Sequence, residues 1–378
     1  MNLGLSERQL ILKKAARDFF QKECPLPLVR EFRDKGTLGA EPWQKLAELG
    51  WLGLAIPEEY GGQGSSFLDL SVSLLEEAGR ALFPFPLTET LAGGAMSIIE
   101  AGSSSAKAQL LSRIVSGKAM VTLALSDDSG DFDPSSGALG AARAESGYTL
   151  HGARSLVPFA ADAELCIVAA RTNGNTAEDG ITVFAVDLRS HGMTIERHRS
   201  VTGRGLHTLM FDETRVGHER VIGEPGDGWA VVSKIACFDA IGRCSIAVGS
   251  ARRMLELTVE MAKTRVQFGQ PIGSFQSIQH QCADMLISVD GMQYVSYQAA
   301  SQLSQKRNCD RQVAIARVYC SDSHKRVAES AVRIHGAVGF TRDHEVGLHF
   351  LIAQDQELPL DHGDFYRRAI AREVLSSG

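Results

Sequence analysis

Three aspartates stand where a carboxylate could take part in acid–base chemistry. Asp239 lies within "ACFDAIGR", and Asp361 and Asp364 lie within "LPLDHGD" near the end of the chain. A carboxylate works as a general base when it is held within hydrogen-bond distance of the proton it removes. Asp is a poor residue for a helix interior, which favours a functional reason for Asp239. The alternative is an i,i+4 ion pair with Arg243, worth about 0.3–0.5 kcal/mol if exposed. For Asp361 and Asp364 the alternative is the loop and N-cap of the last helix.

The elements that position these residues follow from hydrophobic periodicity. Residues 1–117 show apolar residues at helical spacing, beginning with a Ser-x-x-Gln capping pattern in "SERQ". Residues 118–222 contain short β-rich runs separated by Gly, Asn, Asp and Ser, which predict an antiparallel sandwich or barrel. Residues 223–378 return to long amphipathic helices with short loops, typical of a helical bundle. The predicted fold is mainly α with a β insert, in three domains with these boundaries.

Composition limits the class of protein. The chain has 378 residues, a net charge of −6 and 44% hydrophobic residues, with no basic stripe of the kind that binds nucleic acid. No apolar run approaches the roughly 20 residues that span a bilayer, and the N-terminus does not resemble a signal peptide. The 7 cysteines are scattered without a CxxC pair, which indicates free thiols in a cytoplasmic protein and makes a metal site such as zinc unexpected. No G-x-G-x-x-G between a strand and a helix and no P-loop is present.

Three stretches carry a family resemblance. They are "RVQFGQPIGSFQSIQHQCADM" (265–285), "RIHGAVGFTRDHEV" (333–346) and "ELGWLGLAIPEEYGGQG" (48–64). Each resembles a signature of the acyl-CoA dehydrogenase family, and the resemblance extends over nearly the whole chain in the same order. It implies an N-terminal helical domain, a middle β-barrel or sandwich domain and a C-terminal four-helix bundle. It also implies FAD as the cofactor, bound between two subunits.

The resemblance also implies which residues hold FAD on its adenine and pyrophosphate side. Arg265 would offer a planar fork of donors to the pyrophosphate oxygens, and Gly336 would allow its backbone to approach the phosphates. This chain departs from the family at two further contact positions, with Arg333 in place of Gln and Ala337 in place of Gly. The remaining expected contacts are Phe268, Ile272, Phe275 and Gln276.

The flavin-ring side matches the family less well. Members carry a T-E-P-x-x-G-S-D type loop, and this chain has "LSDDSGDFD" (125–133), in which Ser126 keeps a hydroxyl at the Thr position. The next strand of the family carries a W-x-T stretch beside the flavin. Here Leu156, Val157 and Pro158 stand in that place, and Pro removes a backbone donor.

The family reaction removes a proton from the carbon α to a thioester carbonyl and a hydride from the β carbon, and it needs a carboxylate base. The resemblance places the usual base position at Leu360, which cannot take a proton. Some members carry the base on the first long helix of the bundle, and that position falls on Asp239. The expected catalytic residue is therefore Asp239 or a residue of another chain.

Two assemblies stay open. In the favoured one, the chain is half of a hetero-oligomer (α2β2) that supplies the adenine pocket, like bacterial members acting on steroid side chains or dicarboxylic acyl-CoA esters. The stretch "EEAGRALFPFPLTETL" (76–91) resembles that branch. In the other, the chain is a self-sufficient homotetramer with Asp239 as base. A flavin oxidase of the same fold is a further alternative. The substrate expected in each dehydrogenase reading is an acyl-CoA.

Overall fold

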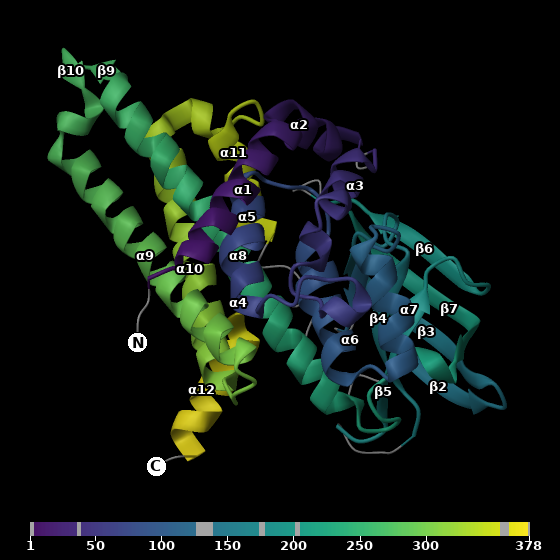
Figure 1. Ribbon diagram of the computed structural model, residues 1–378. Helices are drawn as coiled ribbons and strands as arrows, with labels where there is room; N and C mark the ends of the chain where they lie inside the picture. The colour runs from purple at the N-terminus through teal and green to yellow at the C-terminus, as the bar shows by residue number, and fades with distance from the viewer. Residues whose placement is uncertain are drawn as a thin grey trace.

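The computed structural model describes residues 4–35, 39–125, 139–173, 178–200, 205–355 and 363–376. N-terminal helices, a β-sheet and a C-terminal bundle of long helices follow one another along the chain. In Figure 1 the bundle lies on the left and the sheet on the right, with the N-terminal helices between them. This arrangement confirms the predicted mainly α fold with a β insert.

Short helices make up the N-terminal part. The predicted capping box is present at the first of them: Ser6 Oγ accepts a hydrogen bond from the Gln9 backbone N–H, and Gln9 Oε1 accepts one from the Ser6 N–H. Two segments that the sequence predicts as helices contain π-helical turns, a feature often found at functional sites. The elements are α1 (Glu7–Glu23), α2 (Leu26–Lys35), α3 (Glu41–Glu48), η1 (Trp51–Gly53), η2 (Glu58–Tyr60), α4 (Phe67–Asp69), η3 (Leu70–Leu75), α5 (Glu76–Arg80), η4 (Thr88–Ala95), α6 (Met96–Ala101) and α7 (Ser104–Val115).

The middle part forms one sheet in the order β6-β7-β3-β2-β4-β5-β8, with β1 pairing β4. The expectation of purely antiparallel pairing is wrong at β1, which runs parallel to β4, as β2 does over its single pair Gly140–Arg171. Strand β4 is buried along almost its whole length, which suits a parallel neighbour covered on both faces. The strands are β1 (Val121–Ala124), β2 (Leu139–Ala144), β3 (Gly147–Pro158), β4 (Leu165–Arg171), β5 (Ile181–Asp187), β6 (Met193–His198), β7 (Leu206–Gly217) and β8 (Val221–Ile222), with η5 (His218–Arg220) between the last two.

Three long helices dominate the C-terminal part, and helix α10 packs against both α8 and α9. A two-stranded hairpin, β9–β10, joins α8 to α9 and projects from one end of the bundle in Figure 1. The elements are α8 (Gly228–Thr264), β9 (Val266–Gln267), β10 (Gln270–Pro271), η6 (Ile272–Ser274), α9 (Gln276–Ser304), α10 (Asp310–His335), η7 (Gly336–Phe340), α11 (Glu345–Asp355) and α12 (Gly363–Ser376).

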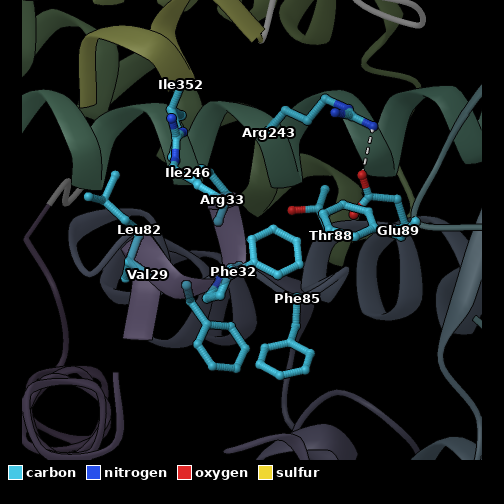
Figure 2. A pocket seen from close by; sticks show the side chains of 13 residues that line it. Val29, Phe32, Arg33, Leu82, Phe85, Thr88, Glu89, Arg243, Ile246 and Ile352 are labelled. Carbon is cyan, nitrogen blue, oxygen red and sulfur yellow. Dashed lines mark hydrogen bonds and ion pairs between the residues drawn. The ribbon is translucent and has the colours of Figure 1, made fainter. Parts of the chain in front are cut away.

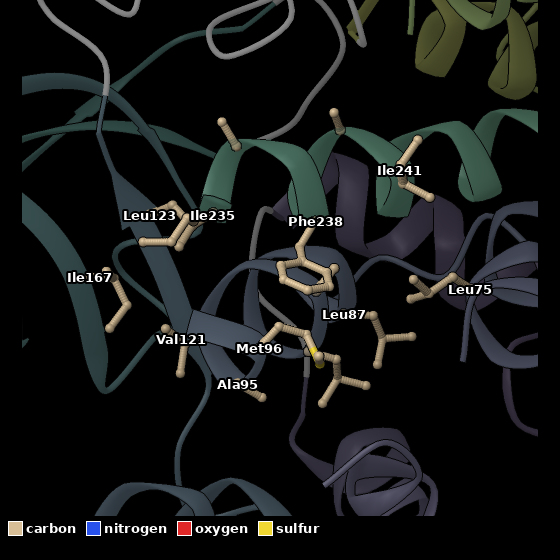
Figure 3. Close-up of a cluster of buried hydrophobic side chains, with 14 of the residues drawn as sticks. Leu75, Leu87, Ala95, Met96, Val121, Leu123, Ile167, Ile235, Phe238 and Ile241 are labelled. Carbon is tan, nitrogen blue, oxygen red and sulfur yellow. The ribbon is translucent and has the colours of Figure 1, made fainter. Parts of the chain in front are cut away.

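A shared apolar core fixes the three parts relative to one another. Figure 3 shows Leu87 and Met96 from the N-terminal part, Val121 and Leu123 from the sheet and Phe238 from helix α8 in a single cluster. All five side chains are buried. Because each part contributes to the same core, a residue on α8 is held in place against both η4 and the sheet.

Small residues bring α5 and α8 into close approach. A Cβ atom at Gly249 would overlap the backbone carbonyl of Glu76, and one at Gly79 would overlap that of Ile246. The two helices therefore pack backbone to backbone at these positions.

Within the described part of the chain, none of the helices has the length and apolar character needed to span a membrane.

Candidate functional site

A cavity of about 120 Å³ lies where α2, η4, α8 and α11 meet the end of strand β3, and it is called the central cavity below. Figure 2 shows aromatic rings on one side and a charged pair on the other. The lining residues are Val29, Phe32, Arg33, Leu82, Phe83, Pro84, Phe85, Thr88, Glu89, Phe159, Arg243, Ile246 and Ile352.

One guanidinium joins two carboxylates at this cavity. Arg243 Nε donates to Asp239 Oδ2 at 2.7 Å, and Arg243 Nη2 donates to Glu89 Oε1 at 3.2 Å. The second of these contacts is the dashed line in Figure 2. Asp239 and Glu89 are each 3% exposed and Arg243 is 4% exposed. Buried charges of this kind persist only when they are paired, so the three side chains form one electrostatic unit.

Asp239, the base expected from the resemblance, forms the i,i+4 ion pair that the sequence offers as its alternative role. The pair is buried rather than exposed, so the low energy expected of an exposed pair does not apply. Asp239 itself is not a lining residue of the central cavity, whereas Arg243 is. A hydrogen bond from a guanidinium stabilises a carboxylate in its charged form and opposes the uptake of a proton.

The carboxylate that lines the cavity is Glu89, which the sequence reasoning missed. It lies on η4, one of the two π-helical segments. The available signal was a lone acidic residue inside the apolar stretch "FPLTETLAGGAM", because a glutamate is almost never fully buried unless it is paired. Periodicity alone cannot show that Arg243, 154 positions later, is its partner.

The residues expected to contact the adenine side of FAD lie together at the exposed end of the bundle. Arg265 Nη1 donates to the His335 backbone carbonyl at 3.1 Å, and the Ile272 N–H donates to the Arg265 carbonyl at 2.9 Å. The rings of Phe268 and Phe275 pack edge to face with centroids 6.2 Å apart. Phe268 is 93% exposed although it is a large apolar residue. We call this region, residues 265–276 with residues 333–337, the hairpin surface.

The second stretch of the hairpin surface begins at the end of α10. Gly336 has φ +68° and would place a Cβ atom in open space, with nothing within 4 Å. Arg333 and Ala337 are exposed. Burial lowers the pKa of His335, whose Nδ1 donates to the Ala331 carbonyl at 2.8 Å, so the ring is neutral and fixes the segment before Gly336.

This donor set fits a dinucleotide cofactor. Two guanidiniums, Arg265 and Arg333, suit pyrophosphate oxygens. An exposed aromatic ring at Phe268 suits an adenosine, and Gln276, which follows Phe275 in the chain, is exposed. The open space above Gly336 leaves room for a phosphate to approach the backbone. The fit extends to the adenine and pyrophosphate half of FAD.

The structure describes only part of the positions expected beside the flavin ring and near the end of the chain. Leu156 and Val157 lie at a register shift between β3 and β7, where Leu156 has φ +57°, and the Pro158 carbonyl accepts a hydrogen bond from Thr122 Oγ1. Ser126 lies outside the described residues, and so do Leu360 and Asp361. For Asp364 only the backbone, in the first turn of α12, is described.

The remaining His, Cys, Asp and Glu side chains bear on two further kinds of site, a metal centre and a reactive thiol, only where the structure describes them. Among residues 4–35, 39–125, 139–173, 178–200, 205–355 and 363–376, no group of three or more His, Cys, Asp and Glu side chains could hold a metal ion. All seven cysteines are free thiols. Burial raises the pKa of the Cys24 thiol to about 12, which keeps it protonated and unreactive.

Comparison with known proteins extends the resemblance. Residues 6–118, 122–214 and 226–374 match family models described as the N-terminal, middle and C-terminal domains of acyl-CoA dehydrogenase. The chain is 27% identical, over 90% of its length and 91% of that protein, to the caffeyl-CoA reductase-Etf complex subunit CarC of Acetobacterium woodii.

Two solved structures have the same fold over almost their whole length. Butyryl-CoA dehydrogenase from Megasphaera elsdenii has a TM-score of 0.93 and 27% identity, covering 99% of this chain and 100% of that one. A chain of the ChsE4-ChsE5 complex from Mycobacterium tuberculosis has a TM-score of 0.89 and 28% identity, covering 99% of both chains. With all three domains matched in order, the protein belongs to the acyl-CoA dehydrogenase family and is an FAD-dependent oxidoreductase.

Proposed function

We propose that this chain is a subunit of an enzyme that oxidises the α,β bond of an acyl-CoA thioester, with FAD bound across an interface between two chains. The observation that carries the proposal is the hydrogen bond from Arg265 to the His335 carbonyl, which joins the two stretches of the hairpin surface. The exposure of Phe268, Val338 and Phe340 beside it supports burial against a cofactor and a second chain.

The chain's own contribution to the cofactor site is the adenine and pyrophosphate half. Arg265 and Arg333 would bind the pyrophosphate oxygens, and Gly336 and Ala337 would present their backbone to it. FAD, when bound, accepts the hydride that leaves the β carbon. The aromatic contact would come from Phe268 and Phe275, and the flanking contacts from Ile272 and Gln276. Ser126 would contact FAD on its flavin-ring side.

The acyl chain would enter the central cavity. Phe32, Phe83 and Phe85 supply apolar wall that excludes water from the chain. The proton on the α carbon would pass to a carboxylate, because the thioester carbonyl acidifies that carbon and a carboxylate can accept a proton as a general base.

The partner that we favour is a different acyl-CoA dehydrogenase-like chain, in a hetero-oligomer such as α2β2. Leu360 stands at the usual base position, and Asp239 is engaged by Arg243, so a second chain would supply the base and the flavin-ring contacts. Relatives named as part of a complex with Etf and as a ChsE4-ChsE5 complex support an assembly of unlike chains.

The second candidate is a self-sufficient homotetramer with Asp239 as the base. It is favoured by one observation, that the central cavity lies within a single chain and has the Asp239–Arg243–Glu89 unit at one side. On this reading the α proton would pass to Asp239 once the substrate has displaced Arg243 from it.

Flavin content of the chain expressed alone separates the two candidates. About one FAD per chain, bleached on addition of an acyl-CoA, would establish the homotetramer. A colourless chain that becomes yellow and active only when co-expressed with a second acyl-CoA dehydrogenase-like chain is the expected result. A chain that binds neither FAD nor acyl-CoA in either condition would refute the proposed function.

A further inference from the structure

The central cavity has an apolar, partly open side and a polar, closed side. Phe83, Phe85 and Ile352 are only half-buried and mark its mouth. Glu89 and Arg243 are almost fully buried and mark its closed end. Coenzyme A is too large for about 120 Å³, so a thioester must enter tail first and bring the far end of its acyl group to Glu89 and Arg243.

Charge around the central cavity is balanced before a ligand arrives. Among the lining residues that the structure describes, the ionic side chains are Arg33, Glu89 and Arg243. Asp239 adds a second carboxylate behind Arg243, 2.7 Å from its Nε. The lining and the residue behind it thus carry two guanidiniums and two carboxylates, and the formal sum is zero.

This balance selects among three kinds of acyl tail. A carboxylate tail would add a buried negative charge beside Glu89 and Asp239 with no excess positive charge to offset it. A methyl tail would strip water from Glu89 and Arg243 and return no hydrogen bond. A hydroxyl or carbonyl oxygen is neutral and can accept from the Arg243 guanidinium, and a hydroxyl can also donate to Glu89.

We propose that the central cavity selects acyl groups whose far end carries a neutral hydrogen-bonding oxygen, and that Glu89 is the residue that rejects a carboxylate there. The inference rests on the favoured hetero-oligomer of the proposed function, because it requires an acyl-CoA to enter this cavity tail first, with its α carbon away from Asp239. It names Glu89 and Arg243 as specificity-determining residues and assigns them no part in proton or hydride transfer.

The test removes the charge of the Glu89 side chain and keeps its size and shape. In Glu89→Gln the formal sum around the central cavity becomes +1, so the carboxylate tail that the wild type rejects should become acceptable. The probes are hexanoyl-CoA, ω-hydroxyhexanoyl-CoA and adipoyl-CoA, or the same three end groups at whichever length from butyryl to octanoyl binds best. Dissociation constants are measured by titration calorimetry on the assembled, FAD-containing protein.

The wild type should bind the hydroxyl-ended thioester about tenfold or more tighter than the carboxylate-ended one. Glu89→Gln should reduce that ratio by about tenfold or more, chiefly by improving adipoyl-CoA binding. Glu77→Gln is the matched control, since Glu77 is equally buried and accepts two 2.8 Å hydrogen bonds from Arg17 outside the central cavity. It should leave the ratio unchanged.

Two outcomes count against the proposal, and they are distinguishable. If the wild type binds the methyl-ended or carboxylate-ended thioester as tightly as the hydroxyl-ended one, or if Glu89→Gln leaves the ratio unchanged, the tail selectivity is wrong while acyl-CoA binding stands. If the assembled protein binds none of the thioesters, the proposed function itself fails.

Discussion

Arg265 donates a hydrogen bond from Nη1 to the backbone carbonyl of His335, 3.1 Å away, although the two residues are 70 positions apart. The bond ties the β9–β10 hairpin to the end of α10. His335 is itself fixed by the hydrogen bond from its ring to the Ala331 carbonyl. The arginine fork is therefore held in orientation before any cofactor arrives, which lowers the entropy that binding must overcome.

Replacing Arg265 by Ala should reduce FAD retention without unfolding the protein. The side chain is exposed, so its removal should change the free energy of unfolding by no more than about 0.5 kcal/mol. The loss of two charge-assisted donors should lower FAD per chain in the assembled enzyme after gel filtration. Arg189→Ala, an exposed arginine in the sheet domain, is the control and should retain full flavin. Equal flavin in both variants would show that Arg265 does not contact the pyrophosphate.

The contact between α5 and α8 should be intolerant of a single methyl group. In Gly249→Ala the new Cβ overlaps the Glu76 carbonyl, so the helices must separate and the surrounding core loses contacts. We expect a loss of about 1–3 kcal/mol in the free energy of unfolding. Gly140→Ala, where the nearest atom to the new Cβ is 3.9 Å away, is the control. Urea denaturation of both variants measures the difference, and equal midpoints would contradict the close approach.

The sequence predicted the helical and β-rich parts well, because periodicity reports local geometry. It could not predict that β1 runs parallel to β4, since strand pairing depends on contacts between residues more than 40 positions apart. The π-helical turns in η3 and η4 were not predicted either, because an inserted turn leaves the apolar pattern almost unchanged.

The hairpin surface and the central cavity also differ in how far the sequence alone predicts them. The hairpin surface depends on stretches of contiguous residues, so family resemblance could propose Arg265 and Gly336 as cofactor contacts from sequence. The central cavity depends on Glu89 and Arg243, which meet only when η4 packs against α8. The sequence offered Asp239 either as a base or as a partner of Arg243, and only the packed structure shows that this ion pair is buried.

Acid should weaken the contact between α8 and α11 through Glu345. Burial raises the pKa of this carboxyl, but His349 and Arg253 outweigh burial and lower the pKa to about 2. A depressed carboxyl pKa stabilises the fold above the unfolded value of about 4.3. That stability is lost as pH falls toward about 2.

In urea titrations between pH 5 and pH 2.5, Glu345→Gln should therefore lose less stability than the wild type. At pH 7 the variant should be the less stable of the two, because Arg253 donates to both oxygens of Glu345 at 2.7 and 2.9 Å. Glu196→Gln, an exposed site on β6, should follow the wild-type pH dependence. Parallel pH profiles for Glu345→Gln and the wild type would contradict the assignment.

Arg243 should matter more to stability than Asp239, one of the two carboxylates it joins. Arg243→Met leaves Asp239 and Glu89 buried together without their cation, and should cost about 3–5 kcal/mol. Asp239→Asn keeps the contact to Glu89, and should cost about 1.5–3 kcal/mol. Combining Arg243→Met with Asp239→Asn and Glu89→Gln removes every charge of the unit and should recover part of the loss. Chemical denaturation of the three proteins checks the order. A triple variant less stable than Arg243→Met alone would mean that shape, rather than charge compensation, holds these residues in place.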